Sequence, residues 1–251
     1  MVYKWNVTLP KLTGKKRRRA YIYLPDDYEE HPERRYPVLY MFDGHNVFFD
    51  YDATYGKSWG MNAYLTRTQT QMIVVAVECN HVGNGRLCEY SPFDHKDSTL
   101  GKVDGRGKPY MDWLVGTLKP FIDKKVRTLP GPEHTLVAGS SMGGLMALYA
   151  VTEYNHVFRR AACLSPSLWV DPEKVADMID AAKIDPDTVI YMDYGSKELF
   201  NHADNATALI GATNQLLKRL VNLTFRIVPG GSHCEACWEQ QIPIFMRCLG
   251  F

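Results

Sequence analysis

Short runs of consecutive apolar residues alternate along the chain with segments in which apolar positions recur every three or four residues. The strand-like runs lie at 19–24, 37–42, 72–78, 135–139, 160–164, 188–194 and 223–228. The later runs are continuously apolar, which is typical of central strands covered by helices on both faces. Segment 3–9 instead alternates apolar with polar residues and predicts an antiparallel strand near the start of the chain.

Amphipathic helices are predicted between these runs, at 111–126, 142–154, 172–182, 206–220 and 235–248. Asp171 is suited to cap the third of them, and Pro172 to occupy its first position. Strands that alternate with helices indicate a mostly parallel sheet with right-handed crossovers. We therefore predict an α/β-hydrolase type of α/β fold, with about eight strands and helices on both faces, as one domain over 1–251.

Segment 80–108 breaks this alternation, because it is polar, rich in glycine and without a clear period. A structureless loop of that length is uncommon in a compact domain unless it is functional or disordered. It follows a strand whose carboxyl end is expected at the ligand-binding edge of the sheet. We predict that it forms a wall of the active site, with a surface insertion as the alternative.

Charge and hydropathy narrow the choice of partners. The 251 residues include 29 Lys and Arg against 28 Asp and Glu, so no long-range field favours nucleic acid or an acidic membrane. The basic run at 15–19 is expected to be a solvated turn leading into an edge strand. No apolar run approaches the roughly 18 residues of a membrane span. The N-terminus lacks the apolar core of a signal peptide, so we expect a cytoplasmic protein.

Six cysteines are present, and Cys234 and Cys237 form a CxxC motif beside His233. Such a motif is typical of half a metal site or of a redox pair. A structural zinc site normally has four ligands, and no second CxxC exists in the sequence. We therefore expect neither a metal nor another cofactor.

Residues 139–143, with the sequence GSSMG, match the G-x-S-x-G motif around Ser141. A strand-like run ends directly before the motif and a helical segment begins directly after it. Strand, tight turn and helix is the setting of a nucleophile elbow, in which the serine hydroxyl projects above the sheet. The adjoining helix N-terminus favours developing negative charge there. Ser141 is the predicted nucleophile.

A serine hydroxyl needs a neighbouring base to take its proton, and in this fold the order along the chain is serine, acid, histidine. Among His156, His202 and His233, only His233 stands in a loop immediately after the last strand-like run. His233 is therefore the predicted base.

The acid should follow an earlier strand and hold the imidazole in the correct tautomer. Glu198 is favoured, because it lies past Gly195, where a loop can turn towards the histidine. Asp193 and, behind it, Asp204 are the alternatives.

An oxyanion needs two backbone donors, and the N–H of Met142, directly after the nucleophile, is the first. The second is expected in the loop after the run at 37–42, where Gly44 permits a close approach and the N–H of His45 is our choice. The His45 side chain as a metal ligand or second base is a weaker alternative.

At these residues the chain resembles esterases of the esterase D type, which include S-formylglutathione hydrolases and feruloyl, acetylxylan and enterochelin esterases. Residues 138–149 (AGSSMGGLMALY) resemble that family's elbow nearly residue for residue, and 164–169 (LSPSLW) its following strand and loop. Residues 41–48 resemble its oxyanion loop, with Asp-Gly replacing His-Gly. Gly195 and Glu198 fit the family's Gly-x-x-Asp/Glu pattern, and His233 follows a glycine-rich turn.

The resemblance also implies a substrate pocket beside the serine. It includes Asp43 and Gly44 of the oxyanion loop and an Arg-x-x-Glu-Tyr-x-Pro element that contains Arg86, Glu89 and Tyr90. From their aromatic character alone, Trp59 and Trp169 are further candidates, because such rings stack on a sugar or an aromatic group.

Together these features predict a serine-dependent carboxylic ester hydrolase that forms an acyl-enzyme with a small acyl ester, such as an acylated sugar or an aromatic ester. The alternatives are an acyltransferase to a sugar alcohol, a feruloyl or siderophore-ester hydrolase, and a carbohydrate-binding module that has lost its chemistry. The expected partner is a small-molecule ester, and a homo-oligomer is compatible with the sequence.

Overall fold

Eight strands form one sheet in the computed structural model, which describes residues 1–97, 101–201, 203–219 and 221–251. The strands, in their order across the sheet, are β1 (Val2–Thr8), β2 (Arg17–Tyr23), β4 (Ile73–Val77), β3 (Val38–Met41), β7 (Thr135–Ser140), β8 (Arg160–Leu164), β9 (Val189–Gly195) and β10 (Asn222–Val228). β2 pairs antiparallel with β1 and β4, and all the other neighbours are parallel. The predicted α/β fold and its antiparallel start are confirmed.

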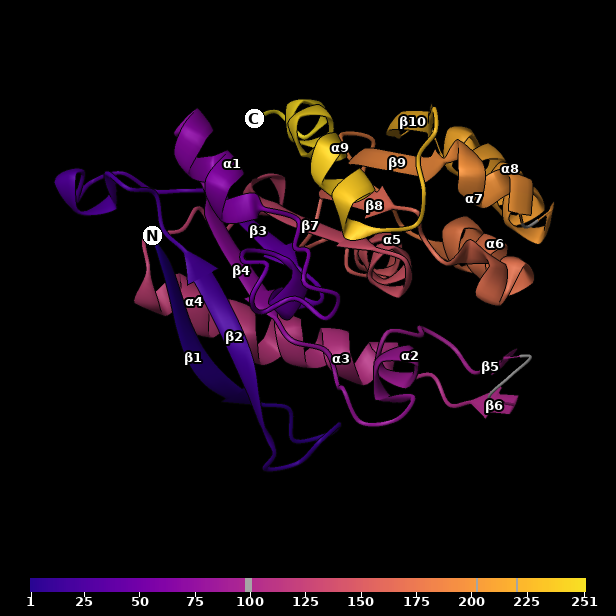
Figure 1. Cartoon of the computed structure of the whole chain (residues 1–251), viewed down its shortest axis with the longest axis horizontal. Helices are drawn as coiled ribbons and strands as arrows, with labels where there is room; N and C mark the ends of the chain where they lie inside the picture. The colour runs from indigo at the N-terminus through magenta and orange to yellow at the C-terminus, as the bar shows by residue number, and fades with distance from the viewer. Residues whose placement is uncertain (98–100, 202, 220) are drawn as a thin grey trace.

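Helices cover both faces of this sheet (Figure 1). They are α1 (Met61–Thr68), α2 (Gly85–Glu89), α3 (Gly107–Trp113), α4 (Lys119–Lys125), α5 (Met142–Glu153), α6 (Pro172–Ala181), α7 (Ser196–Asn201), α8 (Ala203–Lys218) and α9 (Glu235–Cys248). Helices α1 and α9 pack on one face, and α3, α4, α5, α6 and α8 contribute to the core on the other. Within the described residues, no helix combines the length and the apolar character needed to cross a membrane.

Shorter helical turns connect these elements: η1 (Tyr28–Glu30), η2 (Gly44–Asn46), η4 (Pro132–His134) and η5 (Leu168–Val170) are 3-10 turns, and η3 (Leu114–Leu118) is a π-turn. The Asp171 carboxylate caps α6 by accepting a hydrogen bond from the Lys174 N–H at 3.1 Å, as the sequence predicts.

The register of the parallel strands brings the loops of the site together. Ser140 at the end of β7 pairs with Leu164 at the end of β8, and Leu164 pairs with Asp193 near the end of β9. Because parallel strands end at the same edge of a sheet, the segments that follow them lie side by side there. These segments begin with Ser141, Ser165 and Ser196.

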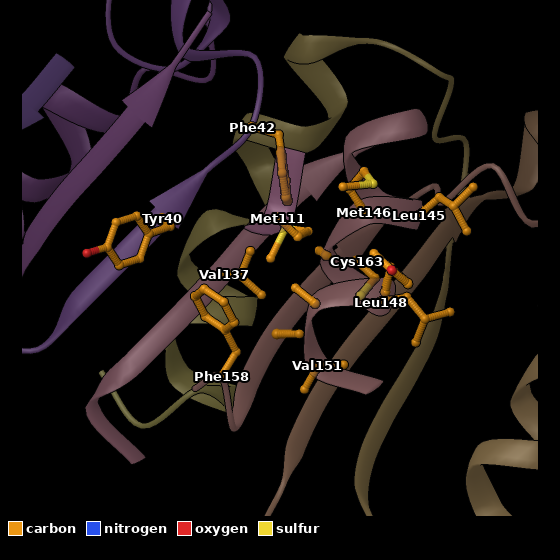
Figure 2. Close-up of a cluster of buried hydrophobic side chains, with 14 of the residues drawn as sticks. Tyr40, Phe42, Met111, Val137, Leu145, Met146, Leu148, Val151, Phe158 and Cys163 are labelled. Carbon is orange, nitrogen blue, oxygen red and sulfur yellow. The ribbon is translucent and has the colours of Figure 1, made fainter. Parts of the chain in front are cut away.

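A buried apolar cluster joins the sheet to α3 and α5 (Figure 2). Phe158, which has no exposed surface, lies in this cluster with its ring edge-on to Tyr40 at a centroid distance of 6.1 Å. Helix α5 is buried along nearly its whole length. The apolar residues around the GSSMG motif thus hold the helix that begins at Met142 firmly against the sheet.

Segment 80–108 is more regular than its sequence indicates. It contains α2, a small hairpin of β5 (His95–Asp97) and β6 (Gly101–Val103), and the first residues of α3. Elements of three to five residues are too short to establish a period that sequence patterns reveal. The predicted helix at 111–126 is interrupted by η3, just before Pro120, which has no N–H to donate to the preceding turn.

The expectation of an edge strand after the basic run is wrong. β2 lies between β1 and β4, and β1 is the edge. Arg18 is buried and its guanidinium lies 2.6 Å from the Glu89 carboxylate, which is also buried. The charge of Arg18 is therefore matched inside the protein instead of protecting a strand edge.

We predict that Phe158→Ala lowers the free energy of unfolding by about 3–5 kcal/mol, because it leaves a cavity in a close-packed core. Urea denaturation followed by circular dichroism measures this difference. Phe121→Ala is the matched control, since Phe121 is 45% exposed on α4 and its loss should cost less than about 0.5 kcal/mol. Equal effects of the two substitutions would contradict the packing described for Phe158.

Candidate active site

Ser141 occupies a strained turn between β7 and α5, with φ 59° and ψ −124°. A non-glycine residue with positive φ is uncommon, and such strain costs on the order of 1–3 kcal/mol. The turn requires a close approach of backbone segments, since a Cβ atom on Gly139 would lie 2.5 Å from the carbonyl carbon of Gly143. A Cβ atom on Gly144 would lie 2.8 Å from the Leu164 carbonyl oxygen. The glycines of the motif therefore allow a sharp turn that presents the serine.

The end of β8 and the loop after it contact Ser141. The Ser141 N–H donates to the Leu164 carbonyl at 3.0 Å, and the Ser141 carbonyl accepts from the Ser167 N–H at 3.1 Å. The two hydroxyl oxygens, Ser141 Oγ and Ser167 Oγ, lie 3.4 Å apart. The backbone of the turn is thus held by β8 and its loop, and the Ser141 hydroxyl has a polar neighbour.

Glu198 and His233 form a direct pair, with His233 Nδ1 2.7 Å from Glu198 Oε2. The other carboxylate oxygen, Glu198 Oε1, accepts hydrogen bonds from the Ser165 hydroxyl at 2.8 Å and from the Gly195 N–H at 2.9 Å. The Glu198 side chain is 6% exposed, whereas that of His233 is 47% exposed. A buried acid therefore carries an imidazole that faces solvent.

These hydrogen bonds also set the charge of the acid. Burial by itself would raise the pKa of Glu198, but the hydrogen bonds from His233, Ser165 and Gly195 outweigh it and lower the pKa below its ordinary value. The carboxylate is therefore ionised at neutral pH and accepts the Nδ1–H of the imidazole. This tautomer leaves Nε2 as the acceptor of a neutral His233.

Residues of α9 support the acid and the histidine. The Trp238 indole N–H donates to Ser165 Oγ at 3.0 Å, and the Trp238 ring lies edge-on to His233 at a centroid distance of 5.0 Å. In the CxxC motif, Cys237 Sγ accepts the Ser232 N–H at 3.2 Å. Cys237 therefore holds the loop that carries His233, a role that the sequence did not indicate.

Ser141 and His233 share no direct hydrogen bond among those of the described residues. Both are instead attached to the loop after β8: Ser141 lies against Ser167, while Ser165 binds the carboxylate that holds His233. Sequence reasoning did not identify Ser165 and Ser167 as site residues. The only signal was the resemblance of the segment LSPSLW to a family loop.

The other candidates for acid and base have different surroundings. Asp193 is buried, accepts the Tyr191 hydroxyl at 2.7 Å and has a pKa that burial raises to about 6. The His156 ring is exposed and packs beside Tyr154. His202 lies outside the described residues, and the side chain of Asp204 is not among those described either.

The loop after β3, which contains the predicted oxyanion donor, packs closely against the end of β4. Asp43 is in the left-handed conformation, and a Cβ atom on Gly44 would lie 2.8 Å from the backbone of Val77. This close approach packs η2, which contains His45, against the end of β4. The N–H of Met142 belongs to the first turn of α5, where it has no intrahelical acceptor.

Two side chains from segment 80–108 anchor that loop. Arg86 Nε and Nη2 donate to the two oxygens of Asp43 at 2.7 and 2.8 Å, and the Tyr90 hydroxyl accepts the Asp43 N–H at 3.1 Å. Although burial would raise the pKa of Asp43, Arg86 beside it holds that pKa below the ordinary value. Burial lowers the pKa of His45, so its ring is neutral at pH 7.

The predicted pocket residues fall into two groups. Trp59, Glu89 and Tyr90 are buried: Trp59 packs on Trp238, Glu89 pairs with Arg18, and Tyr90 lies beneath Asp43. They support the loops of the site, and a substrate does not reach their side chains in this structure. Trp169 in η5 is 42% exposed, two residues after Ser167. It is the aromatic candidate that presents its ring to solvent.

Known proteins share this sequence pattern and fold. Residues 13–246 match the family described as Putative esterase. The uncharacterised protein YbbA of Bacillus subtilis (strain 168) is 24% identical over 184 residues, which make up 72% of this chain and 69% of YbbA. A solved ferulic acid esterase superposes with a TM-score of 0.69 and 19% identity, covering 99% of this chain and 98% of that one.

The enterobactin esterase FES of Shigella flexneri superposes with a TM-score of 0.74 and 19% identity, covering 99% of this chain and 59% of that one. At this level of identity the two structures establish the α/β-hydrolase fold, while the match over 13–246 covers most of the chain and establishes the family. The chain accordingly belongs to the family described as Putative esterase and is a carboxylic ester hydrolase.

Proposed function

We propose that the protein is a serine esterase in which Ser141 is the nucleophile, His233 the base and Glu198 the acid. The observation that carries this proposal is the 2.7 Å contact between Glu198 and His233, together with the strained backbone of Ser141. A buried, ionised carboxylate on Nδ1 is the arrangement that directs Nε2 of a histidine towards a nucleophile. A glycine–serine turn without a catalytic role would need neither a strained serine backbone nor a buried carboxylate paired with a histidine.

The reaction proceeds in two steps. His233 Nε2 takes the Ser141 proton while Ser141 Oγ attacks the ester carbonyl, and the protonated imidazole then gives that proton to the departing alcohol. Water next attacks the acyl-enzyme, with His233 again accepting and returning the proton, so that the acid is released and Ser141 is restored. Glu198 stabilises the imidazolium in both steps without itself becoming protonated.

The oxyanion is proposed to bind the N–H groups of Met142 and His45. The first lies at the N-terminus of α5, where the helix dipole favours negative charge. The second is placed by the packing of Gly44 on Val77 and by the ion pair between Asp43 and Arg86. Each such donor is worth roughly 3–4 kcal/mol of transition-state stabilisation.

The proposal requires the His233 ring to come within hydrogen-bonding reach of Ser141 Oγ when substrate binds. Catalytic hydrogen bonds are often long in ligand-free enzymes and shorten in the substrate complex. The half-exposed ring stands in a loop after β10, so this loop, and not a strand of the sheet, would have to move.

Small acyl esters of an aromatic or sugar group are the proposed substrates. Trp169 offers an exposed ring beside the loop of Ser167, on which a sugar or an aromatic group would stack. The structural similarity to a ferulic acid esterase and to an enterobactin esterase is compatible with such esters.

Ser141→Ala is expected to abolish hydrolysis of a small aryl acetate and labelling by a fluorophosphonate probe, because both reactions need the serine oxygen. Ser167→Ala is the control, since Ser167 also carries a hydroxyl at this place but is not the proposed nucleophile, and it should still be labelled. Turnover and labelling are followed by absorbance and by mass spectrometry. Retained turnover in Ser141→Ala would exclude the proposed nucleophile.

Glu198→Gln should reduce kcat by about 10³–10⁴-fold, as for other serine hydrolases whose acid is made an amide, because the imidazole tautomer is no longer enforced. Asp193→Asn tests the alternative acid and should keep kcat within about tenfold of wild type, a loss of at most about 1.4 kcal/mol. Steady-state kinetics on the same ester decides between the two. A larger loss of kcat in Asp193→Asn than in Glu198→Gln would mean that Asp193, and not Glu198, is the acid.

The lowered pKa of Glu198 predicts a pH-dependent contribution to stability. Its ionised form is favoured in the folded state, so the stabilisation is present above the pKa of the unfolded chain, about 4.3, and is lost as pH falls through the lower folded pKa. The difference in free energy of unfolding between wild type and Glu198→Gln should therefore narrow from pH 7 to about pH 3.

Urea denaturation across that range measures the difference. Glu153→Gln, at an exposed position at the end of α5, is the control and should show a smaller change with pH. If the difference in free energy of unfolding between wild type and Glu198→Gln grew on acidification, this would contradict the sign of the pKa shift.

A further inference from the structure

His45, Cys79 and His81 form a cluster behind the oxyanion loop, and no step of the proposed reaction uses their side chains. One potential ligand atom from each residue lies within 4.8 Å of the others. Cys79 Sγ lies 3.9 Å from His81 Nδ1, and the rings of His45 and His81 are edge-on at a centroid distance of 4.5 Å. Two imidazoles and a thiol thus converge on one small volume.

The topology of the sheet explains why these residues meet. His45 belongs to η2 after β3, whereas Cys79 and His81 follow β4. β3 and β4 are parallel neighbours and end at the same edge. The packing of Gly44 against Val77 holds the two following segments together.

The His45 side chain also has an unsatisfied polar atom. The His45 residue is 5% exposed, and its buried Nδ1 has no hydrogen-bond partner. A buried polar group without a partner is destabilising, so such groups are rare in native structures. This nitrogen belongs to an imidazole ring that lies edge-on to a second imidazole in a cluster with a thiol, and a metal ion is a partner that would satisfy it.

We propose that His45, Cys79 and His81 bind a divalent ion of the zinc class. Imidazole and thiolate are the ligands that Zn²⁺ prefers, and three protein ligands leave a fourth position for water. Tetrahedral bonds of this kind place the ligand atoms about 3.3–3.6 Å apart. The 3.9 Å between Cys79 Sγ and His81 Nδ1 is close to that spacing, and metal binding would require a small movement of the exposed His81 side chain.

Binding of the metal ion releases one proton. The Cys79 thiol gives its proton to solvent as the S–Zn bond forms, and the two neutral imidazoles donate lone pairs. The two oxygens of the Asp43 carboxylate accept hydrogen bonds from Arg86, so Asp43 stays outside the ligand set. The exposed His81 provides access for the ion from solvent.

Titration of the full chain with Co²⁺ tests the proposal, because a cobalt–thiolate bond gives a charge-transfer absorption that is independent of esterase activity. One equivalent should produce this band, and Zn²⁺ should displace the Co²⁺. Absence of the band under reducing conditions would overturn the proposal.

Matched variants locate the ion. Cys79→Ser should remove the band, and His81→Ala should weaken Co²⁺ binding by about 10–100-fold or more, since loss of even an outer-shell partner has that effect. His156→Ala, another exposed histidine, should leave the affinity unchanged. If the band instead persists in Cys79→Ser and disappears in Cys234→Ser, the CxxC motif binds the metal and the proposal is wrong.

Discussion

The close backbone contact between β7 and α5 at the GSSMG motif is the constraint on which the site depends. Gly139 approaches the backbone of Gly143 so closely that it tolerates no side chain without movement, and the strained conformation of Ser141 lies between the two glycines. The buried surface of α5 offsets this strain, because a helix that packs along nearly its whole length cannot move away from the sheet. The serine is thereby held at the edge where the loops of β3, β8 and β9 meet.

The acid is stabilised in a different way. A carboxylate as buried as Glu198 would be costly without partners, and both of its oxygens have them. Ser165 is central to this arrangement, since it donates to Glu198 and accepts from Trp238. One loop after β8 thus supports the acid through Ser165 and contacts the serine through Ser167.

Much of the fold was predictable because its strands are continuous apolar runs, and the period of α9 was clear enough to give its bounds. Helix α1 was not predicted, since Met61–Thr68 is only eight residues long and Gly60 at its start provides no side-chain cap. The internal position of β2 was hidden, because the partner of Arg18 is Glu89, far along the chain. Local patterns do not reveal such distant pairings.

For the site, motif and strand order were sufficient to select Ser141, Glu198 and His233, and the structure brings the last two together. The supporting hydroxyls of Ser165 and Ser167 and the thiol of Cys237 were not identified, because their partners depend on tertiary structure. The burial of Trp59 and Tyr90 could not be predicted either, because an aromatic residue gives the same sequence signal in a core and in a pocket.

The attachment of segment 80–108 to the oxyanion loop has a consequence for how this enzyme can diversify. Arg86 and Tyr90 connect the two, whereas the β5–β6 hairpin contributes neither contact and can change in length or composition while the geometry around Asp43 persists. New ester preferences can therefore arise through changes in this hairpin, without changes in the residues proposed to cleave the ester bond.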